Sequence, residues 1–437
     1  MRALKTGLVA LVILLNLDQN LYAQFGSTLN GVGAVSRSMG GTTTAAPLDS
    51  LGAFQWNPAT ISALPSSMDF GMELLMPRST LSSQIDPGSL GGGFPPVQLA
   101  GATDSDGGVY PLPEFGLVYR PDGSDLTLGV GVLMVGGFGV NYPGSVSNPL
   151  LTPPPPAGLG VGPVYTQYQL MQVVPTAAFQ LTDALSVSVS PVLGLAGLSA
   201  DPGIVAAPDA AAGGAPTYPP MTHGAYQWGA GFQLGAFYEI DDAWQLGASF
   251  KSPQWFNDFE YHSRDQIGAA RRLEFGLDAP MTVSIGAAFK GVERWLFAID
   301  AKYLDYANTE GYEASGFRPD GAIAGLGWDS VCAVSVGAQH ELTDRTDVRM
   351  GYSYSTNPID DAMSFYNVGA PLVVEHGLYA GAGFDVTERL KLSVAWSHYF
   401  ENSVTGPLQT MGGPIAGTRV SSSGYANSIL FGATVLY

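Results

Sequence analysis

The sequence has one cysteine and few charged residues, and these shortages exclude several classes of protein. Cys332 is the single cysteine among 437 residues, so an intrachain disulfide framework and a cysteine-based zinc site are both excluded. Charged residues make up 13% of the chain, about half the usual share of a soluble protein. There are 18 Lys and Arg against 37 Asp and Glu, and this acidic balance argues against nucleic-acid binding, which needs clustered cations.

Long apolar runs are also missing beyond the N-terminus, where no stretch of about 18 uninterrupted apolar residues occurs. Residues 1–23 carry two cations before a short apolar run from Gly7 to Leu17 and end at Ala23. This pattern predicts a secretory signal peptide that is cleaved after Ala23. The alternative is a retained membrane anchor, although Asp18 interrupts the run.

Glycine, proline and aromatic residues are abundant, and together they favour β structure. The 57 Gly and 31 Pro would weaken helix interiors. The 20 Tyr, 20 Phe and 7 Trp argue against a disordered chain. An exported chain this apolar needs an apolar environment for part of its surface.

Apolar and small residues alternate along several segments of about ten residues. From Leu126 to Val140, bulky apolar side chains occupy mainly the even positions, and Gly, Thr and a few others the odd ones. The same period of two recurs at 185–195, 281–290, 390–400 and 429–437. Such segments, separated by turns, predict an all-β fold, a transmembrane antiparallel β-barrel of the bacterial outer membrane. The alternative is a large soluble β-sandwich.

Tight and long connections alternate along the chain. Six short polar turns occur at 121–124, 182–184, 241–243, 291–294, 343–346 and 387–389. Longer connections lie between them at 81–108, 143–163, 201–224, 309–325, 358–371 and 403–422, and a seventh is expected near 262–272. With both ends of the chain in the periplasm, this pattern predicts 14 strands. The last strand ends at Tyr437 and is expected to bind the barrel assembly machinery.

Residues 24–66 do not follow this rhythm, and residues 67–437 are assigned to the barrel. The N-terminal stretch is rich in Gly, Ala, Ser and Thr and has no sustained alternation. It is interpreted as a hatch that plugs the lumen, where small residues permit close approach of the backbone. A periplasmic tail is the alternative.

A series of motifs runs along the chain in a fixed order. The N-terminal motif consists of Gly31, Gly33, Gly40, Gly41, Asp49 and the triplet Asn57, Pro58 and Ala59. Further segments follow at 249–261, 279–290, 295–307, 348–359 and 375–400. In this order the motifs resemble the FadL/TodX family of outer-membrane transporters for fatty acids and other hydrophobic compounds. The chain departs from the family pattern at Tyr306, where Trp is frequent, and at Pro47–Leu48.

The resemblance implies passive uptake of a hydrophobic substrate and its lateral release at a kink in the third strand. That strand is expected at Leu126–Tyr142, and its outer half contains Gly136, Gly137 and Gly139. Glycines inside a strand often mark a bend or bulge. The Asn57–Pro58–Ala59 triplet is expected to abut this kink. Alternatively, the glycines only relieve crowding in the lumen.

Candidate substrate-binding residues come from the strands and from the connection at 201–224. Phe138 lies among the glycines of the third strand, and Ile204 and Val205 belong to the long connection. A carboxylate substrate would need lumenal cations, and Lys251 and Arg349 are preferred because they lie within alternating runs. The alternative for residues 201–224 is an ordinary flexible surface loop.

The sequence contains no common catalytic or metal-binding motif, so we expect no enzyme, metal or cofactor. G-x-S-x-G, H-E-x-x-H and P-loop patterns are missing, and the five histidines lack ligand spacing. The main alternative function is a general or polar-solute porin. The expected partners are the hydrophobic substrate and outer-membrane lipid, and a barrel with its own plug is expected to be a monomer.

Overall fold

A computed structural model describes residues 25–91, 97–155, 157–209, 217–265 and 267–437. The expected signal peptide, residues 1–23, lies outside the described residues. None of the helices in these ranges is long and apolar enough to cross a membrane.

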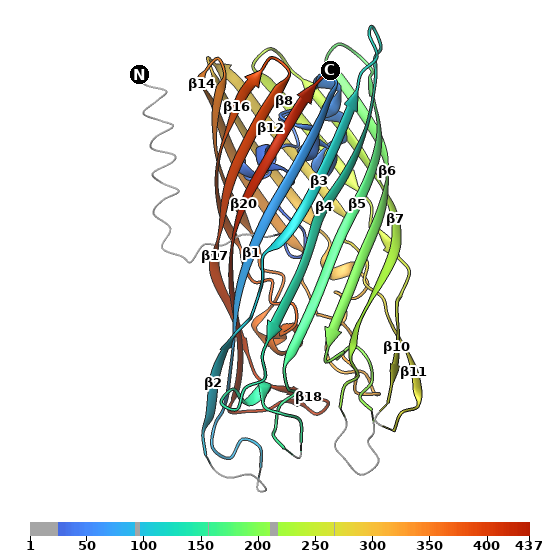
Figure 1. Ribbon diagram of the computed structural model, residues 1–437, viewed down its shortest axis with the longest axis vertical. Coiled ribbons are helices and arrows are strands. Elements are labelled where there is room, and N and C mark those ends of the chain that lie inside the picture. The colour runs from blue at the N-terminus through green and yellow to red at the C-terminus, as the bar shows by residue number, and fades with distance from the viewer. Residues whose placement is uncertain (1–24, 92–96, 156, 210–216, 266) are drawn as a thin grey trace.

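Within the described ranges, fourteen long antiparallel strands close into one barrel, as the sequence predicted (Figure 1). The second strand is broken into two segments, β2 and β3, and the two-residue segment β9 pairs beside β7. The barrel strands are β1 (Ser67–Ile85), β2 (Leu99–Asp104), β3 (Tyr110–Tyr119), β4 (Leu126–Tyr142), β5 (Val164–Gln180), β6 (Leu185–Asp201), β7 (Met221–Glu239), β8 (Trp244–Lys251), β12 (Thr282–Val292), β13 (Trp295–Leu304), β14 (Val331–Thr343), β15 (Thr346–Ser355), β16 (His376–Thr387), β17 (Leu390–Gly406) and β20 (Thr418–Leu436).

The barrel closes between its first and last strands. β1 pairs with β20 along its whole length, from Ser67↔Leu436 to Ile85↔Thr418. Closure satisfies the backbone hydrogen bonds of both strands, which a bilayer requires.

The remaining elements are β9 (Trp255–Phe256), β10 (Phe259–Arg264), β11 (Ala270–Phe275), β18 (Gln409–Thr410), β19 (Gly413–Pro414), the α-helices α2 (Ala34–Ser38) and α3 (Ser50–Trp56), and the 3-10 helices η1 (Pro58–Ala63), η2 (Pro149–Leu151), η3 (Tyr306–Asn308) and η4 (Asp361–Asn367).

Alternation along each strand separates an apolar outer face from a small, polar inner face. On β14, Val334 and Val336 are 44% and 43% exposed, whereas Ser335 between them is 1% exposed. The exposed valines lie on the outer face of the barrel, where apolar side chains contact lipid and not water. The small inward residues leave room in the lumen for the N-terminal segment.

Several strands are longer than the turn pattern suggested. β1 continues to Ile85 and β20 begins at Thr418, both inside segments that the sequence assigned to loops. Their outer parts carry Ser, Thr and Arg in place of apolar residues, so a search for apolar alternation does not detect them. The wall therefore extends well beyond its apolar belt.

The N-terminal segment lies inside the barrel, in the half that contains the short turns and the C-terminus (Figure 1). Its helices are too short to be stable alone. Contacts with the wall stabilise them: α2 packs against β15, β16 and β17, and α3 packs against β3 and β4. We call residues 25–29 the strap and residues 30–64 the hatch body.

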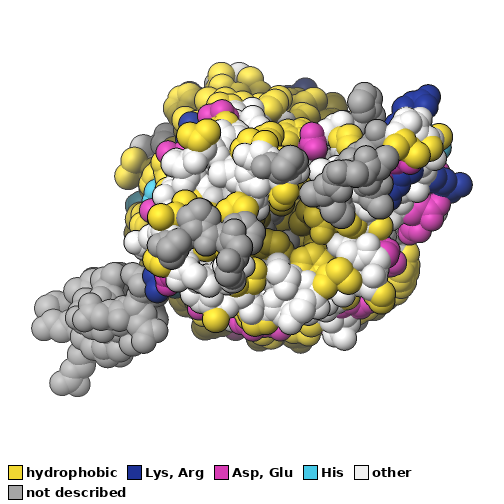
Figure 2. Space-filling view, turned by 90° about the horizontal axis from the view of Figure 1, so that it is seen from below, with side chains coloured by type: hydrophobic (Ala, Val, Ile, Leu, Met, Phe, Trp, Pro, Cys, Tyr) yellow, Lys and Arg dark blue, Asp and Glu magenta, His cyan; other side chains and the backbone are white. Residues whose placement is uncertain are grey.

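Viewed from the end with the long connections, the molecule is hollowed near its centre, and hydrophobic side chains line the hollow (Figure 2). The hollow lies at the opposite end of the barrel from the hatch body (Figure 1). Two apolar cavities lie in this half of the barrel.

Candidate functional site

The wall of the barrel has a window between β3 and β4. These strands pair only from Tyr119↔Leu128 to Phe115↔Val132. β3 continues past this point as far as Tyr110, and β4 as far as Tyr142, but among the described residues they form no further pairs. The unpaired part of β4 includes the three glycines that the sequence singled out.

Two prolines explain why pairing stops at this point. Pro111 and Pro113 lie on β3 just beyond the last pair, and proline has no N–H to donate to a neighbouring strand. On the other side, β4 has a register irregularity against β5 between Met134 and Gly136. The sequence Pro111–Leu112–Pro113 was the signal for the window, and the sequence reasoning missed it.

The window is bridged again toward the end with the long connections. Ser105 donates its N–H to the carbonyl of Ser79 on β1 (2.8 Å), and Asp106 donates its N–H to the carbonyl of Asn141 on β4 (2.8 Å). The Ser105 hydroxyl also accepts the N–H of Asn141 at 2.9 Å. The opening is therefore bounded on all sides by hydrogen-bonded backbone.

The strap covers the inner face of the window. Leu29 donates its N–H to the carbonyl of Val135 (2.8 Å), and Gly137 donates its N–H to the carbonyl of Ser27 (2.9 Å). A Cβ on Gly136 would lie 2.2 Å from the Ser27 carbonyl oxygen, so only glycine permits this approach. The bulge at the glycines therefore has a docking function, in addition to bending the strand.

Aromatic side chains hold the strap from the lumen. The Tyr306 hydroxyl donates to the carbonyl of Phe25 (2.9 Å) and lies 3.2 Å from the hydroxyl of Ser27. Gln55 and Trp56 of α3 donate to the carbonyls of Leu29 (2.7 Å) and Asn30 (3.0 Å). Tyr306, which the sequence marked as a departure from the family pattern, is thus a direct contact of the strap.

The expectation that the Asn57–Pro58–Ala59 triplet abuts the glycines of β4 is wrong. Asn57 donates its side-chain amide to the carbonyls of Ala236 on β7 (2.9 Å) and Thr44 (2.7 Å). A Cβ on Gly235 would lie 3.0 Å from the backbone nitrogen of Ala59, which places the triplet against the same strand. The segment at the glycines is the strap, because the chain enters the lumen beside the window before it turns toward β7.

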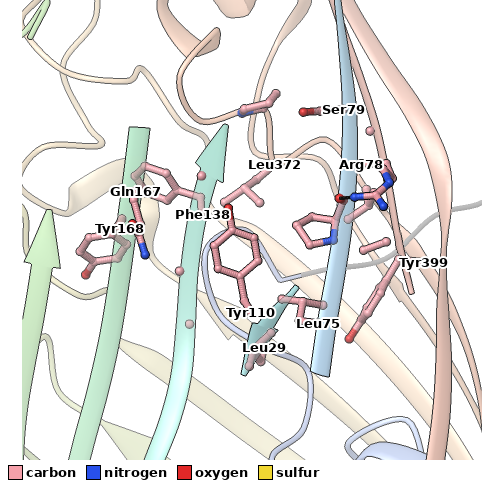
Figure 3. A pocket seen from close by; sticks show the side chains of 18 of the residues that line it. Leu29, Leu75, Arg78, Ser79, Tyr110, Phe138, Gln167, Tyr168, Leu372 and Tyr399 are labelled. Atoms are coloured by element: carbon pink, nitrogen blue, oxygen red, sulfur yellow. Dashed lines mark hydrogen bonds between the residues drawn. The ribbon is translucent and has the colours of Figure 1, made fainter. Parts of the chain in front are cut away.

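A cavity of about 110 Å³, which we call the window cavity, fills the opening (Figure 3). Phe138 and Tyr168 lie on the β4–β5 side, Leu75 lies on the β1 side, and Leu29 of the strap lies at the bottom of this view. Tyr110 lies between these two sides (Figure 3). The cavity therefore extends from the strap toward the outer surface of the wall.

A second cavity of about 90 Å³, the loop cavity, lies under the long connections. Ile204 and Val205 line it together with Phe275, Leu277 and other apolar residues. Phe138 lines both cavities. The structure thus brings together three of the predicted substrate-binding residues: Phe138, Ile204 and Val205.

Lys251 and Arg349, the two predicted head-group cations, line neither apolar cavity. The Lys251 ammonium donates to the carbonyl of Gln55 in the hatch body (3.0 Å) and to the side chain of Gln172 (3.2 Å). Arg349 forms an ion pair with Asp347 and donates to Gln339 (2.7 Å). Their role in substrate binding stays a prediction, and the contacts of Lys251 suggest an additional role in holding the hatch body.

A buried ion pair and a buried lysine fix the hatch body to the barrel. Arg37 of α2 forms a fully buried ion pair with Glu73 of β1 (2.6 Å). Lys302 of β13 pairs with Asp300 (2.8 Å), donates to the carbonyl of Gly41 (2.9 Å) and lies 4.6 Å from the centroid of the Trp56 indole. Charged groups at this depth need several partners to offset the loss of water.

A pocket of about 180 Å³ with several charged residues in its lining lies next to the hatch body, at the end with the short turns. Asp49, Arg349, Asp385 and Lys391 line it. Asp49 caps α3 by accepting the N–H of Gly52 (3.0 Å). Burial, together with the nearby charge of Asp69, raises the pKa of Asp49 to about 7.

The described residues contain no group of three or more His, Cys, Asp and Glu side chains that could hold a metal ion. Cys332 is exposed on β14. The apolar cavities and the strap are the features of the described residues that indicate a function.

Comparisons with known proteins place this geometry in context. The family model described as "Outer membrane protein transport protein (OMPP1/FadL/TodX)" matches residues 25–437. The toluene transporter TodX of Pseudomonas putida is 18% identical with a TM-score of 0.65, and the match covers 93% of this chain and 99% of that one. A FadL homologue of Pseudomonas aeruginosa is 13% identical with a TM-score of 0.68, covering 94% and 99%. The toluene transporter TbuX of Ralstonia pickettii is 17% identical with a TM-score of 0.62, covering 92% and 98%. A search of curated protein sequences finds no match.

Proposed function

The chain belongs to the OMPP1/FadL/TodX family of outer-membrane transport proteins, and we propose that it takes up fatty acids or other hydrophobic small molecules and releases them sideways through the window. Members of this family are transport channels and not enzymes. Family membership alone determines neither the substrate class nor the exit.

The observation that carries the proposal is the shared wall residue Phe138, which borders both the loop cavity and the window cavity, so that the two cavities are neighbours. Apolar side chains line most of both cavities. A hydrophobic substrate gains roughly 0.8 kcal/mol for each CH₂ group removed from water, so a route through these apolar cavities would favour it over a polar solute. We infer that Phe138, Ile204 and Val205 contact the substrate along this route.

Lateral release is supported by the segments of β3 and β4 that do not pair with each other. In this proposal Gly136, Gly137 and Gly139 form the gate together with the strap, and Asn57, Pro58 and Ala59 fix the hatch body to β7. Withdrawal of the strap would join the window cavity to the lumen without moving the buried ion pairs. The substrate would then enter the bilayer without crossing water.

The division of the chain is part of the same proposal. Residues 1–23 would be removed on export, residues 24–66 would form the hatch and residues 67–437 the barrel. The last strand, which ends beside Tyr437, would bind the assembly machinery, and outer-membrane lipid would surround the apolar belt. Because the barrel closes on itself and carries its own plug, we propose that it functions as a monomer.

The porin alternative has less support, because a buried hatch body occupies one half of the lumen. A liposome-swelling assay separates the two functions. Rapid permeation of sugars through the intact protein would favour a porin, whereas slow permeation together with uptake of a hydrophobic probe would favour the proposed function.

A substitution in the window tests lateral release. Leu112 lines the window cavity, and Leu112→Trp would fill it with an indole. We expect uptake of labelled hexadecanoate and of a neutral hydrocarbon to fall on the order of tenfold, the size of an overpacking penalty. The control is Leu117→Trp, on the paired part of β3 and outside the cavity. Normal uptake by both variants would contradict lateral release.

A further inference from the structure

Arg78 of β1 lies at the edge of the window. It is exposed, and its cross-strand neighbour on β20 is Tyr425. Nearer the short-turn end of β1, on the same outer face, Phe70 and Met72 are 48% and 38% exposed, whereas Thr80 follows Arg78 toward the other end. Arg78 therefore stands where the outer face changes from apolar to polar, the level at which lipid head groups lie.

Arg78 is the one charged residue among the described residues that line the window cavity. The lining of the loop cavity contains no charged residue among the part of the chain that is described. A carboxylate is costly to bury without a partner. An amphiphile that leaves through the window therefore meets a single cation at the point where its head group reaches the surface.

The guanidinium of Arg78 retains capacity for a ligand. Its Nη1 donates to the carbonyls of Gly107 (2.8 Å) and Pro77 (3.2 Å). Within the described ranges, Arg78 forms no ion pair, and its side chain donates only these two hydrogen bonds. Arginine can present two parallel N–H groups to one carboxylate, so Nε and Nη2 suit a second partner.

Two acidic side chains share an outer groove of about 310 Å³ with Arg78. Asp104 accepts a hydrogen bond from the Thr80 hydroxyl (2.6 Å), and Glu401 lies on the groove as well. Both carboxylates oppose the binding of another anion. They would keep the complex short-lived, which suits a site through which substrate passes.

We propose that Arg78 binds the carboxylate head group of an amphiphilic substrate at the outer mouth of the window. The inference rests on the proposed function, because it requires that substrate passes this opening. It gives the channel a preference for fatty acids over neutral molecules of the same chain length. Arg78 also supports the backbone at Gly107, so the test must separate binding from support.

The test compares hexadecanoate with hexadecanol, which share a chain and differ in the head group. We expect Arg78→Gln to lower hexadecanoate uptake about tenfold, the typical loss of a hydrogen bond to a charged group, and to leave hexadecanol uptake unchanged. Arg78→Lys should restore most hexadecanoate uptake. Asp104→Asn should strengthen hexadecanoate binding, measured by retention on the purified protein.

Arg419→Gln is the matched control, because Arg419 is an exposed arginine on neighbouring β20, outside the window cavity. An equal loss for both probes in Arg78→Gln would show a supporting role and overturn the inference, as would no loss for either. If the unmodified protein takes up neither probe, the proposed function itself fails. If it takes up both and Arg78→Gln is normal, only the inference fails.

Discussion

The hatch body and the strap are held in the barrel by different kinds of interaction. The hatch body is fixed by the buried ion pair of Arg37 with Glu73 and by the side-chain amide of Asn57, which binds β7. The strap is held at the window by neutral hydrogen bonds, most of them through its backbone, and by the buried ring of Phe25, which packs edge-on against Trp56. Breaking a buried ion pair costs about 3–5 kcal/mol, whereas a neutral hydrogen bond contributes about 1 kcal/mol. We therefore expect the strap to leave its site more easily than the hatch body.

The largest effect is expected when the hatch body loses one member of its buried ion pair. Glu73→Gln leaves the charge of Arg37 without its partner and should destabilise docking of the hatch body by about 3–5 kcal/mol. We expect frequent channel openings in planar bilayers and new trypsin cleavage at Arg37. The double variant Arg37→Met/Glu73→Gln should be less leaky, and equal leakage of the two variants would contradict this account.

A methyl group at the window should displace the strap alone. Gly136→Ala places a carbon 2.2 Å from the Ser27 carbonyl oxygen, and overpacking of this kind costs about 1–3 kcal/mol. Amide hydrogen exchange should become faster at Leu29 and remain unchanged in α3. Gly144→Ala is the control, because its Cβ would have ordinary contacts of 3.6 Å or more. Loss of protection in α3 would show that the strap and the hatch body move together.

Removal of one hydroxyl should loosen the strap slightly. Tyr306→Phe keeps the ring and removes the hydrogen bond to the Phe25 carbonyl, a loss of about 1 kcal/mol. We expect about fivefold faster exchange of the strap amides, with no change in the conductance of the closed channel. An unchanged exchange rate would mean that the lumenal aromatic residues do not determine the position of the strap.

The pH dependence of the hatch body follows from the buried carboxyl group of Asp49. The pKa of Asp49 rises from an ordinary 3.8 to about 7 when the hatch body is docked, so the docked form binds a proton that the displaced form loses. Docking is therefore strongest at low pH and weakens as the pH rises through this interval. Amide protection of α3 should be higher at pH 5.5 than at pH 8. Asp49→Asn should reduce this difference, while the strap should show little pH dependence in either protein.

The strands were predictable, because a period of two sustained over about ten residues is typical of a strand with one apolar face and of little else. The prediction of a fourteen-stranded barrel with an internal hatch is confirmed, and β4 has the expected bounds, Leu126–Tyr142. The outward residues Ser82 and Gln84 give no apolar signal, so the sequence predicted a loop from residue 81 on, where β1 in fact continues to Ile85. Alternation detects the part of a strand that faces lipid and misses the rest.

The site was harder to predict, because its parts come together only in three dimensions. Phe138 was recognised among its glycines, but the contact between Ser27 and Gly136 joins residues far apart in sequence. The position of the Asn57 triplet depends on the path of the chain through the lumen, which periodicity does not determine. Pro111 and Pro113 were visible in the sequence, and a proline pair inside a strand is a signal that could have located the window.

The bridges that Ser105 and Asp106 make at the far end of the window have a consequence for how copies of the barrel behave beside one another. An exposed strand edge is a template to which another chain can add a strand, and this is a common route to aggregation. Here the unpaired backbone is confined between two hydrogen-bonded ends, and its inner face is already occupied by residues 27–29. A neighbouring molecule in a crowded membrane therefore finds no free strand edge at this opening to which it could add a strand.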